Sequence, residues 1–163
     1  MNSPGQEQKA SHRDAAGHNA PSVRPESNHV LEEARSAARL IRAVIVDDSP
    51  SVLKALSMIL EEETNVQLIG TATDGYHAVR RVAELAPDLV LMDLQLPGIN
   101  GLEATRQIKA RSQAPSVIML TADDTPACRA AARAAGTDDF VGKQQMFTQL
   151  HAAIRKLFPG PIH

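Results

Sequence analysis

The chain has 163 residues, of which 43% are apolar, and its formal net charge at pH 7 is −2. This length suggests one domain plus an additional segment, and the near-neutral charge gives no general attraction to nucleic acid or membranes. With no Trp, one Tyr and three Phe, the core must be built from aliphatic side chains. One cysteine, Cys128, permits no internal disulfide, and neither a signal peptide nor a membrane-length apolar run is evident. We therefore expect a cytoplasmic protein.

The two ends of the chain differ in composition from its centre. Residues 1–29 are rich in small and polar residues, so we predict a disordered tail that cannot offset its ordering entropy. Residues 30–41 are predicted to form a short helix leading into the domain, because apolar residues recur there at helical spacing: Leu31, Ala34, Ala38 and Ile41. The domain itself is predicted over residues 42–158, followed by a C-terminal tail over 159–163.

Strand and helix patterns alternate through the predicted domain. Five apolar runs are typical of buried strands: Ala43–Val46, Val66–Gly70, Leu89–Met92, Val117–Leu120 and Phe140–Val141. Three helices between them are predicted to start at capping signals, which are Ser49-Pro50, Asp74 and Thr125-Pro126, and another helix is predicted over Gly101–Arg111. A last helix is predicted from Met146 to about Phe158, with one apolar face: Phe147, Leu150, Ile154 and Leu157.

This alternation predicts an α/β fold in which a parallel five-stranded sheet lies between two layers of helices. The flavodoxin-like strand order 2-1-3-4-5 fits best, because the second and fifth strands are the least apolar and suit the sheet edges. Ligands of such sheets bind beyond the carboxyl ends of the strands, where the first and third strands meet.

Polar side chains stand at these predicted strand ends. Asp47 and Asp48 follow the first strand, Asp93 the third, Thr121 the fourth and Lys143 the fifth. Each alone is more often a capping, turn or surface residue, but their joint placement favours a site.

The chemistry of such a site follows from its charges. Adjacent carboxylates repel each other by about 4 kcal/mol per close pair at an effective dielectric near 20. A shared proton or a divalent cation would relieve this repulsion, and Mg²⁺ is the better candidate when phosphate oxygens and a backbone carbonyl such as that of Gln95 complete its coordination. A carboxylate in this setting can also attack phosphorus, with Lys143 and Thr121 neutralising or bonding the phosphoryl oxygens.

Four segments carry a resemblance to a known family: Val44–Ser49, Pro87–Glu103, Ile118–Ala122 and Gly136–Lys143. In this order and spacing, the chain resembles the receiver domain of two-component response regulators over about residues 41–158. One departure is Gln144, where many members of the family carry Pro.

The resemblance implies a role for each site residue. Asp93 would accept a phosphoryl group from a histidine kinase or a histidine phosphotransfer protein. Mg²⁺ would be held by the following groups: Asp47, Asp48, Asp93 and the backbone of Gln95. Thr121 and Lys143 would contact the phosphoryl group, and Phe140 would be the switch aromatic that moves with Thr121. Gln95 and Asp123 would tune the lifetime of the phosphoryl group.

The function implied is a phosphorylation-activated switch with no enzymatic activity beyond its own phosphorylation and dephosphorylation. The surface formed by the helix from Thr125, the strand Phe140–Val141 and the last helix would be read by a downstream protein or a second copy, with no nucleic acid or membrane bound by this chain itself. An alternative is the receiver fragment of a DNA-binding transcription regulator. An aspartyl-phosphate phosphatase is disfavoured, because such hydrolases require a second Asp at the position of Gln95.

Overall fold

The computed structural model describes residues 39–160. The elements follow one another in this order: β1 (Ile41–Val46), α2 (Pro50–Glu61), β2 (Val66–Ala72), α3 (Gly75–Leu85), β3 (Leu89–Asp93), α4 (Gly101–Lys109), β4 (Ser116–Thr121), α5 (Pro126–Ala135), β5 (Asp139–Gly142), the 3₁₀ turn η1 (Lys143–Gln145) and α6 (Met146–Leu157). The predicted tail, the residues 30–38 of the predicted helix, and residues 161–163 lie outside the described part.

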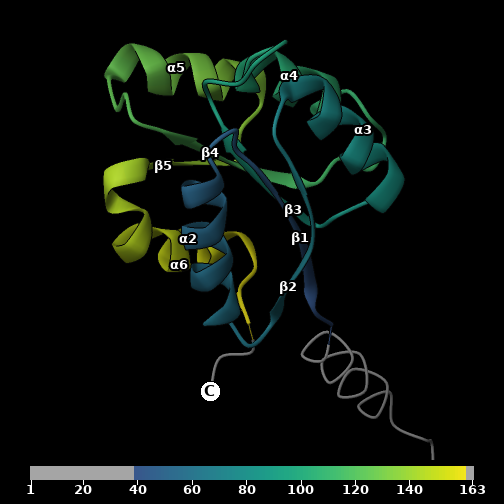
Figure 1. Ribbon diagram of the computed structural model, residues 1–163, viewed down its shortest axis with the longest axis vertical. Coiled ribbons are helices and arrows are strands. Elements are labelled where there is room, and N and C mark those ends of the chain that lie inside the picture. The colour runs from purple at the N-terminus through teal and green to yellow at the C-terminus, as the bar shows by residue number, and fades with distance from the viewer. Residues whose placement is uncertain (1–38, 161–163) are drawn as a thin grey trace, which may run out of the picture.

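The strands form one parallel sheet in the order β2-β1-β3-β4-β5, which confirms the predicted flavodoxin-like topology. Helices α2 and α6 cover one face, and α3, α4 and α5 cover the other (Figure 1). Every residue of the central strand β3 is buried, whereas most residues of the edge strand β2 are half-buried or exposed. Burial on both faces explains why the central strands are continuous apolar runs.

The helices begin at the carboxyl edge of the sheet, and side chains fix three of these starts. Asp74 accepts a hydrogen bond from the His77 amide at 2.7 Å, and Thr125 caps α5 by accepting from the Cys128 amide. Asn100 caps α4 in the same way. The side chain of Ser49 caps no amide and instead pairs with the Ser51 hydroxyl. The loops at the carboxyl edge are therefore anchored on three of the four helices that follow β1 to β4.

Two details differ from the sequence-based prediction. Ile41 is not helical: it opens β1, pairs with Val66 and belongs to the core under α2 and α6. Phe147 does not face inward: it is 60% exposed, because 3.6 residues per turn place it beside the buried stripe of Met146, Leu150, Ala153 and Ile154 and not within it. Within residues 39–160, no helix combines the length and apolar character needed to cross a membrane.

Candidate functional site

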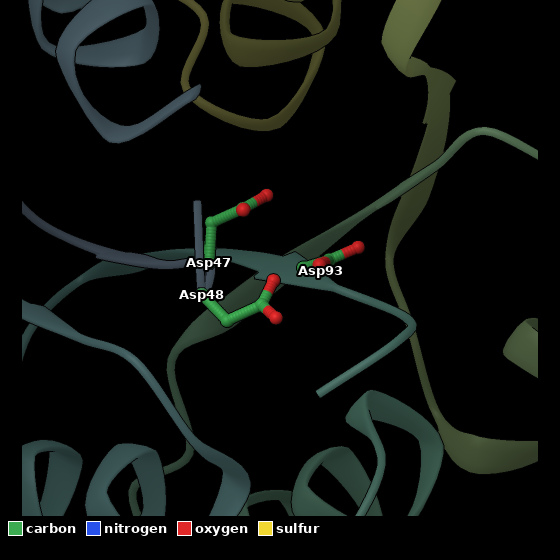
Figure 2. Close-up of side chains that lie close together, drawn as sticks. All are labelled: Asp47, Asp48 and Asp93. Carbon is green, nitrogen blue, oxygen red and sulfur yellow. The ribbon is translucent and has the colours of Figure 1, made fainter. Parts of the chain in front are cut away.

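Three carboxylates meet where the neighbouring strands β1 and β3 end (Figure 2). Asp47 and Asp48 directly follow β1, and Asp93 is the last residue of β3. One carboxylate oxygen from each residue lies within 4.8 Å of the other two. Asp47 is fully buried and Asp93 is 3% exposed, whereas Asp48 faces solvent. The pairing of β1 with β3 therefore brings the predicted acidic residues together with one side of the cluster open.

Lys143 reaches this acidic cluster from the far side of β4. It is the first residue after β5, and its Nζ lies 2.6 Å from Asp47 Oδ2 and 3.0 Å from Asp93 Oδ1. The Asp47 oxygen lacks a hydrogen bond of good geometry despite this short distance, so the contact acts as an ion pair. The other carboxylate oxygen of Asp47, Oδ1, accepts a hydrogen bond from the Ser49 amide at 2.9 Å. One ammonium thus partly neutralises two buried carboxylates.

The surroundings shift the acid–base behaviour of both Asp93 and Lys143. Burial is the main cause that raises the pKa of Asp93, and the negative charge of Asp47 adds to it, while the bond to Lys143 opposes both. Burial alone would lower the pKa of Lys143, but its contacts with Asp47 and Asp93 together raise that pKa above its usual value. Lys143 is therefore fully charged at neutral pH, and the charged form of Asp93 is less favourable than that of an ordinary aspartate.

The acidic cluster has the donor chemistry that Mg²⁺ requires. Mg²⁺ prefers a few carboxylate oxygens and keeps several water ligands, which suits two buried carboxylates and the solvent-facing Asp48. The buried Asp47 Oδ2 already faces positive charge, because the Lys143 ammonium lies 2.6 Å from it. The Gln95 amide lies 3.4 Å from Asp93 Oδ1, so the start of the β3–α4 loop passes beside the same carboxylate. The residues present therefore fit the ion.

The β3–α4 loop is held tightly beneath Asp93. The Gly101 amide donates to the Leu94 carbonyl at 2.8 Å, which closes the loop on itself. A Cβ atom at Gly101 would lie only 2.0 Å from the carbonyl oxygen of Asp93. Glycine is thus required at this position for the loop to approach the backbone of Asp93 as closely as it does.

Thr121 and Phe140 occupy the strands on the other side of β3. Thr121 ends β4, is 1% exposed, and accepts a hydrogen bond at its Oγ1 from the Asp123 amide at 3.0 Å. Phe140 pairs through its backbone with Met119 of β4 and packs against the core beneath α3, α4 and α5. The strands therefore bring Thr121 to the same sheet edge as the acidic cluster, and Phe140 lies further back on β5.

Arg129 and Asp124, which lie beside Phe140, could not be identified as site residues from the sequence. The Arg129 guanidinium lies 4.6 Å from the centre of the Phe140 ring, and it binds both oxygens of the Asp124 carboxylate. No local pattern marks them, because Arg129 and Phe140 approach each other only when α5 packs beside β5.

The fold and this site together define a receiver module of two-component signalling. The chain belongs to the response regulator receiver domain family, whose model matches residues 43–155. Members of this family are phosphoacceptors, and Mg²⁺ binding at an acidic pocket is a general feature of them.

Several curated relatives are much longer than the region they share with this chain. A protein-glutamate methylesterase/protein-glutamine glutaminase of Koribacter versatilis is 38% identical over 107 residues, which cover 64% of this chain and 29% of the relative. The DNA-binding response regulator MtrA of Mycolicibacterium smegmatis is 39% identical over 115 residues, or 70% of this chain and 49% of the relative. This chain thus spans less than half the length of these two curated relatives.

Solved receiver structures match the chain more completely. The response regulator domain of Thermotoga maritima CheB is 30% identical with a TM-score of 0.68, and the match covers 74% of this chain and 97% of that one. A LuxR-family response regulator from Aurantimonas is 32% identical with a TM-score of 0.70, covering 74% of this chain and 86% of the other.

Proposed function

We propose that Asp93 accepts a phosphoryl group from a histidine kinase or a histidine phosphotransfer protein, and that this switches the domain between two states. The observation that carries the proposal is the position of Asp93. It is buried at the end of β3, within 4.8 Å of Asp47 and Asp48, and its Oδ1 lies 3.0 Å from the Lys143 ammonium. A nucleophilic carboxylate therefore stands beside the charges that phosphoryl transfer requires.

The chemistry assigned to the chain is a single displacement at phosphorus. A carboxylate oxygen of Asp93 forms the new bond to phosphorus, and the bond to the donor breaks with its electron pair leaving on the donor. Lys143 then pairs with the phosphoryl oxygens, and the hydroxyl of Thr121 turns toward them. Bound Mg²⁺, held by Asp47, Asp48, Asp93 and the Gln95 carbonyl, would supply positive charge to the transferred group. Gln95 and Asp123, two residues after Asp93 and Thr121, would set how readily water removes the phosphoryl group.

The output of this switch is proposed to be a changed surface formed by α5, β5 and α6, with Phe140 responding to Thr121. A phosphoryl group adds nearly two negative charges, which bias a two-state equilibrium at the site. A downstream protein or a second copy of the chain would read the surface. The relatives named as transcription regulators support an alternative, in which the domain belongs to a DNA-binding regulator. Under both hypotheses, the protein-binding switch and the DNA-binding regulator, we propose that the domain works in the cytoplasm with its phosphodonor.

We further infer that the domain has no turnover of its own beyond its phosphorylation and dephosphorylation. Phosphatases that use an aspartyl phosphate require a second acid two residues after the nucleophile, and this chain has Gln95 there. The relatives named as methylesterases match over only about a third of their length, so their activity is not carried over. Release of phosphate from phosphate esters in excess over the protein would contradict this inference.

The proposal is tested by incubating the protein with Mg²⁺ and acetyl phosphate and measuring its intact mass. We expect the mass to rise by one phosphoryl group, with no rise without Mg²⁺ or in the variant Asp93→Asn. The matched control is Asp74→Asn, because Asp74 follows the neighbouring strand β2 and asparagine caps a helix equally well. An Asp93→Asn variant that is phosphorylated as fast as the wild type would overturn the proposal.

A further inference from the structure

Two contacts in series connect the loop after Thr121 with the ring of Phe140. The Asp124 carboxylate in the β4–α5 loop accepts from Arg129 on α5, with a distance of 2.8 Å between Asp124 Oδ2 and Arg129 Nη2. The same guanidinium lies over the Phe140 ring at 4.6 Å from its centre. These residues, which we call the Asp124–Arg129–Phe140 stack, join three separate elements of the fold.

The geometry of the guanidinium makes it suited to fixing an aromatic ring. Two nitrogens of Arg129, Nε and Nη2, bind the two oxygens of Asp124, so one edge of the guanidinium is held by two parallel hydrogen bonds and its plane is fixed. A planar cation held in this way covers one face of the ring, which attracts it through the ring quadrupole. Phe140 also packs against the core beneath α3, α4 and α5. The ring is therefore held by two contacts, one with the core and one with the guanidinium.

In the stack, Asp124 lies near Thr121 and Lys143, the two residues proposed to contact the phosphoryl group. Asp124 directly follows Asp123, whose amide donates to the Thr121 hydroxyl at 3.0 Å. A Cβ atom placed on Gly142 would lie 3.6 Å from Asp124 Oδ2, so the carboxylate also passes beside the residue that precedes Lys143. A movement of Thr121 toward Asp93 would pull on the loop that carries Asp124.

We propose that Arg129, oriented by Asp124, is a positioning residue that holds the Phe140 ring in the state where the Thr121 hydroxyl is bonded to its own loop. This inference rests on the proposed switch function and names residues of this chain that set its resting balance. When Thr121 turns toward a phosphoryl group, the loop shifts, the Asp124–Arg129 pairing changes and the ring is released. The stack thus opposes switching, and its loss favours the switched state.

The expected effect follows from the strength of a partly exposed cation–ring contact. Such a contact shifts an equilibrium by about two- to fivefold. The variant Arg129→Gln should therefore bind beryllofluoride with Mg²⁺, an analogue of the phosphoryl group, about two- to fivefold more tightly than the wild type. Arg129→Lys keeps the charge but lacks the planar fork, so it should resemble Arg129→Gln. Asp124→Asn should shift the affinity in the same direction.

A matched control separates this effect from a change in net charge. Arg133 lies one turn further along α5 and is exposed, so Arg133→Gln removes the same charge from the same helix. We expect Arg133→Gln to leave the affinity for beryllofluoride unchanged. In a Phe140→Leu background, Arg129→Gln should have no further effect, because the ring on which Arg129 acts is absent. An equal change in both Arg variants, or a persisting effect in that background, would overturn the inference.

A second measurement decides the inference even if the proposed function fails. The chain contains three Phe, so the Phe140 ring can be assigned by NMR and its contacts with core methyl groups followed in the protein without phosphoryl analogue. We expect these contacts to weaken in Arg129→Gln and Asp124→Asn, and to be retained in Arg133→Gln. Unchanged ring contacts in Arg129→Gln would refute the positioning role, whereas failure of the wild type to bind beryllofluoride would refute the phosphoacceptor function.

Discussion

Replacing Asp93 by asparagine should stabilise the protein when no divalent cation is present. The carboxylate oxygens of Asp47, Asp48 and Asp93 lie within 4.8 Å of one another, so each pair repels by at least about 3.5 kcal/mol at an effective dielectric near 20. The Lys143 ammonium, 3.0 Å from Asp93, attracts the Asp93 carboxylate by about 5.5 kcal/mol at the same effective dielectric. Solvent screens the exposed Asp48, and burial adds to the cost of the Asp93 charge.

The balance of these terms predicts a gain of about 1–2 kcal/mol in the unfolding free energy of Asp93→Asn at pH 7. The raised pKa of Asp93 has the same sign, because a carboxyl group that binds its proton more tightly when folded makes the folded state less stable wherever it is ionised. Urea unfolding followed by circular dichroism in the presence of a chelator measures the difference, which should appear as a higher midpoint at unchanged slope.

Addition of Mg²⁺ should make the wild type more stable than Asp93→Asn. A cation present at a hundredfold excess over its dissociation constant stabilises the folded wild type by about 2.7 kcal/mol, and Asp93→Asn lacks one of the proposed ligands. The control is again Asp74→Asn, whose stability should match the wild type to within about 0.5 kcal/mol in both conditions. An Asp93→Asn variant less stable than the wild type in chelator would show that the ion pair with Lys143 outweighs the repulsion, and would refute this account of the site.

Three further predictions address the same site. As the pH falls from about 7 toward 4 in chelator, the stability difference between Asp93→Asn and the wild type should shrink. The reason is that the wild type regains stability as Asp93 is protonated below its raised pKa. A constant difference in stability over this pH range would contradict the raised pKa. Lys143→Met should lower the unfolding free energy by about 2 kcal/mol, since it leaves two buried carboxylates without their cation. The control Lys156→Met removes an exposed ion pair and should lower the unfolding free energy by less than about 1 kcal/mol. Gly101→Ala should cost about 1–3 kcal/mol and slow phosphorylation, because its Cβ would press on the Asp93 carbonyl; Gly160→Ala, with open space around it, is the control in both unfolding and phosphorylation assays.

The layout of the sheet was predictable because it is encoded in short stretches of sequence. Strands that are buried on both faces must be continuous apolar runs, and Leu89–Met92 of β3 is apolar and buried at each of its positions. Weakly apolar strands belong at the edges, which fixed the outer places of β2 and β5. Once this order is known, Asp47, Asp93 and Thr121 must lie at one edge, because they follow parallel strands.

Features that depend on packing between distant segments were not predictable. The helical spacing of Ile41 from Ala38 predicts a helix, yet the pairing of Ile41 with Val66 makes it part of β1. Phe147 lies beside the buried stripe of α6, and its 60% exposure depends on which neighbouring segments cover that flank of the helix. The contact of Arg129 with Phe140 is likewise absent from any local pattern.

The central claim, that Asp93 is the phosphoryl acceptor, is tested most directly by locating the modified residue. The wild-type protein is incubated with acetyl phosphate and Mg²⁺, treated with borohydride to reduce the acyl phosphate to an alcohol, and then cleaved and mapped by mass spectrometry. We predict that the reduced residue is Asp93 and that no other aspartate is reduced, including Asp47 and Asp48 beside it. Reduction at another residue, or an unmodified Asp93 in protein that carries a phosphoryl group, would contradict the account.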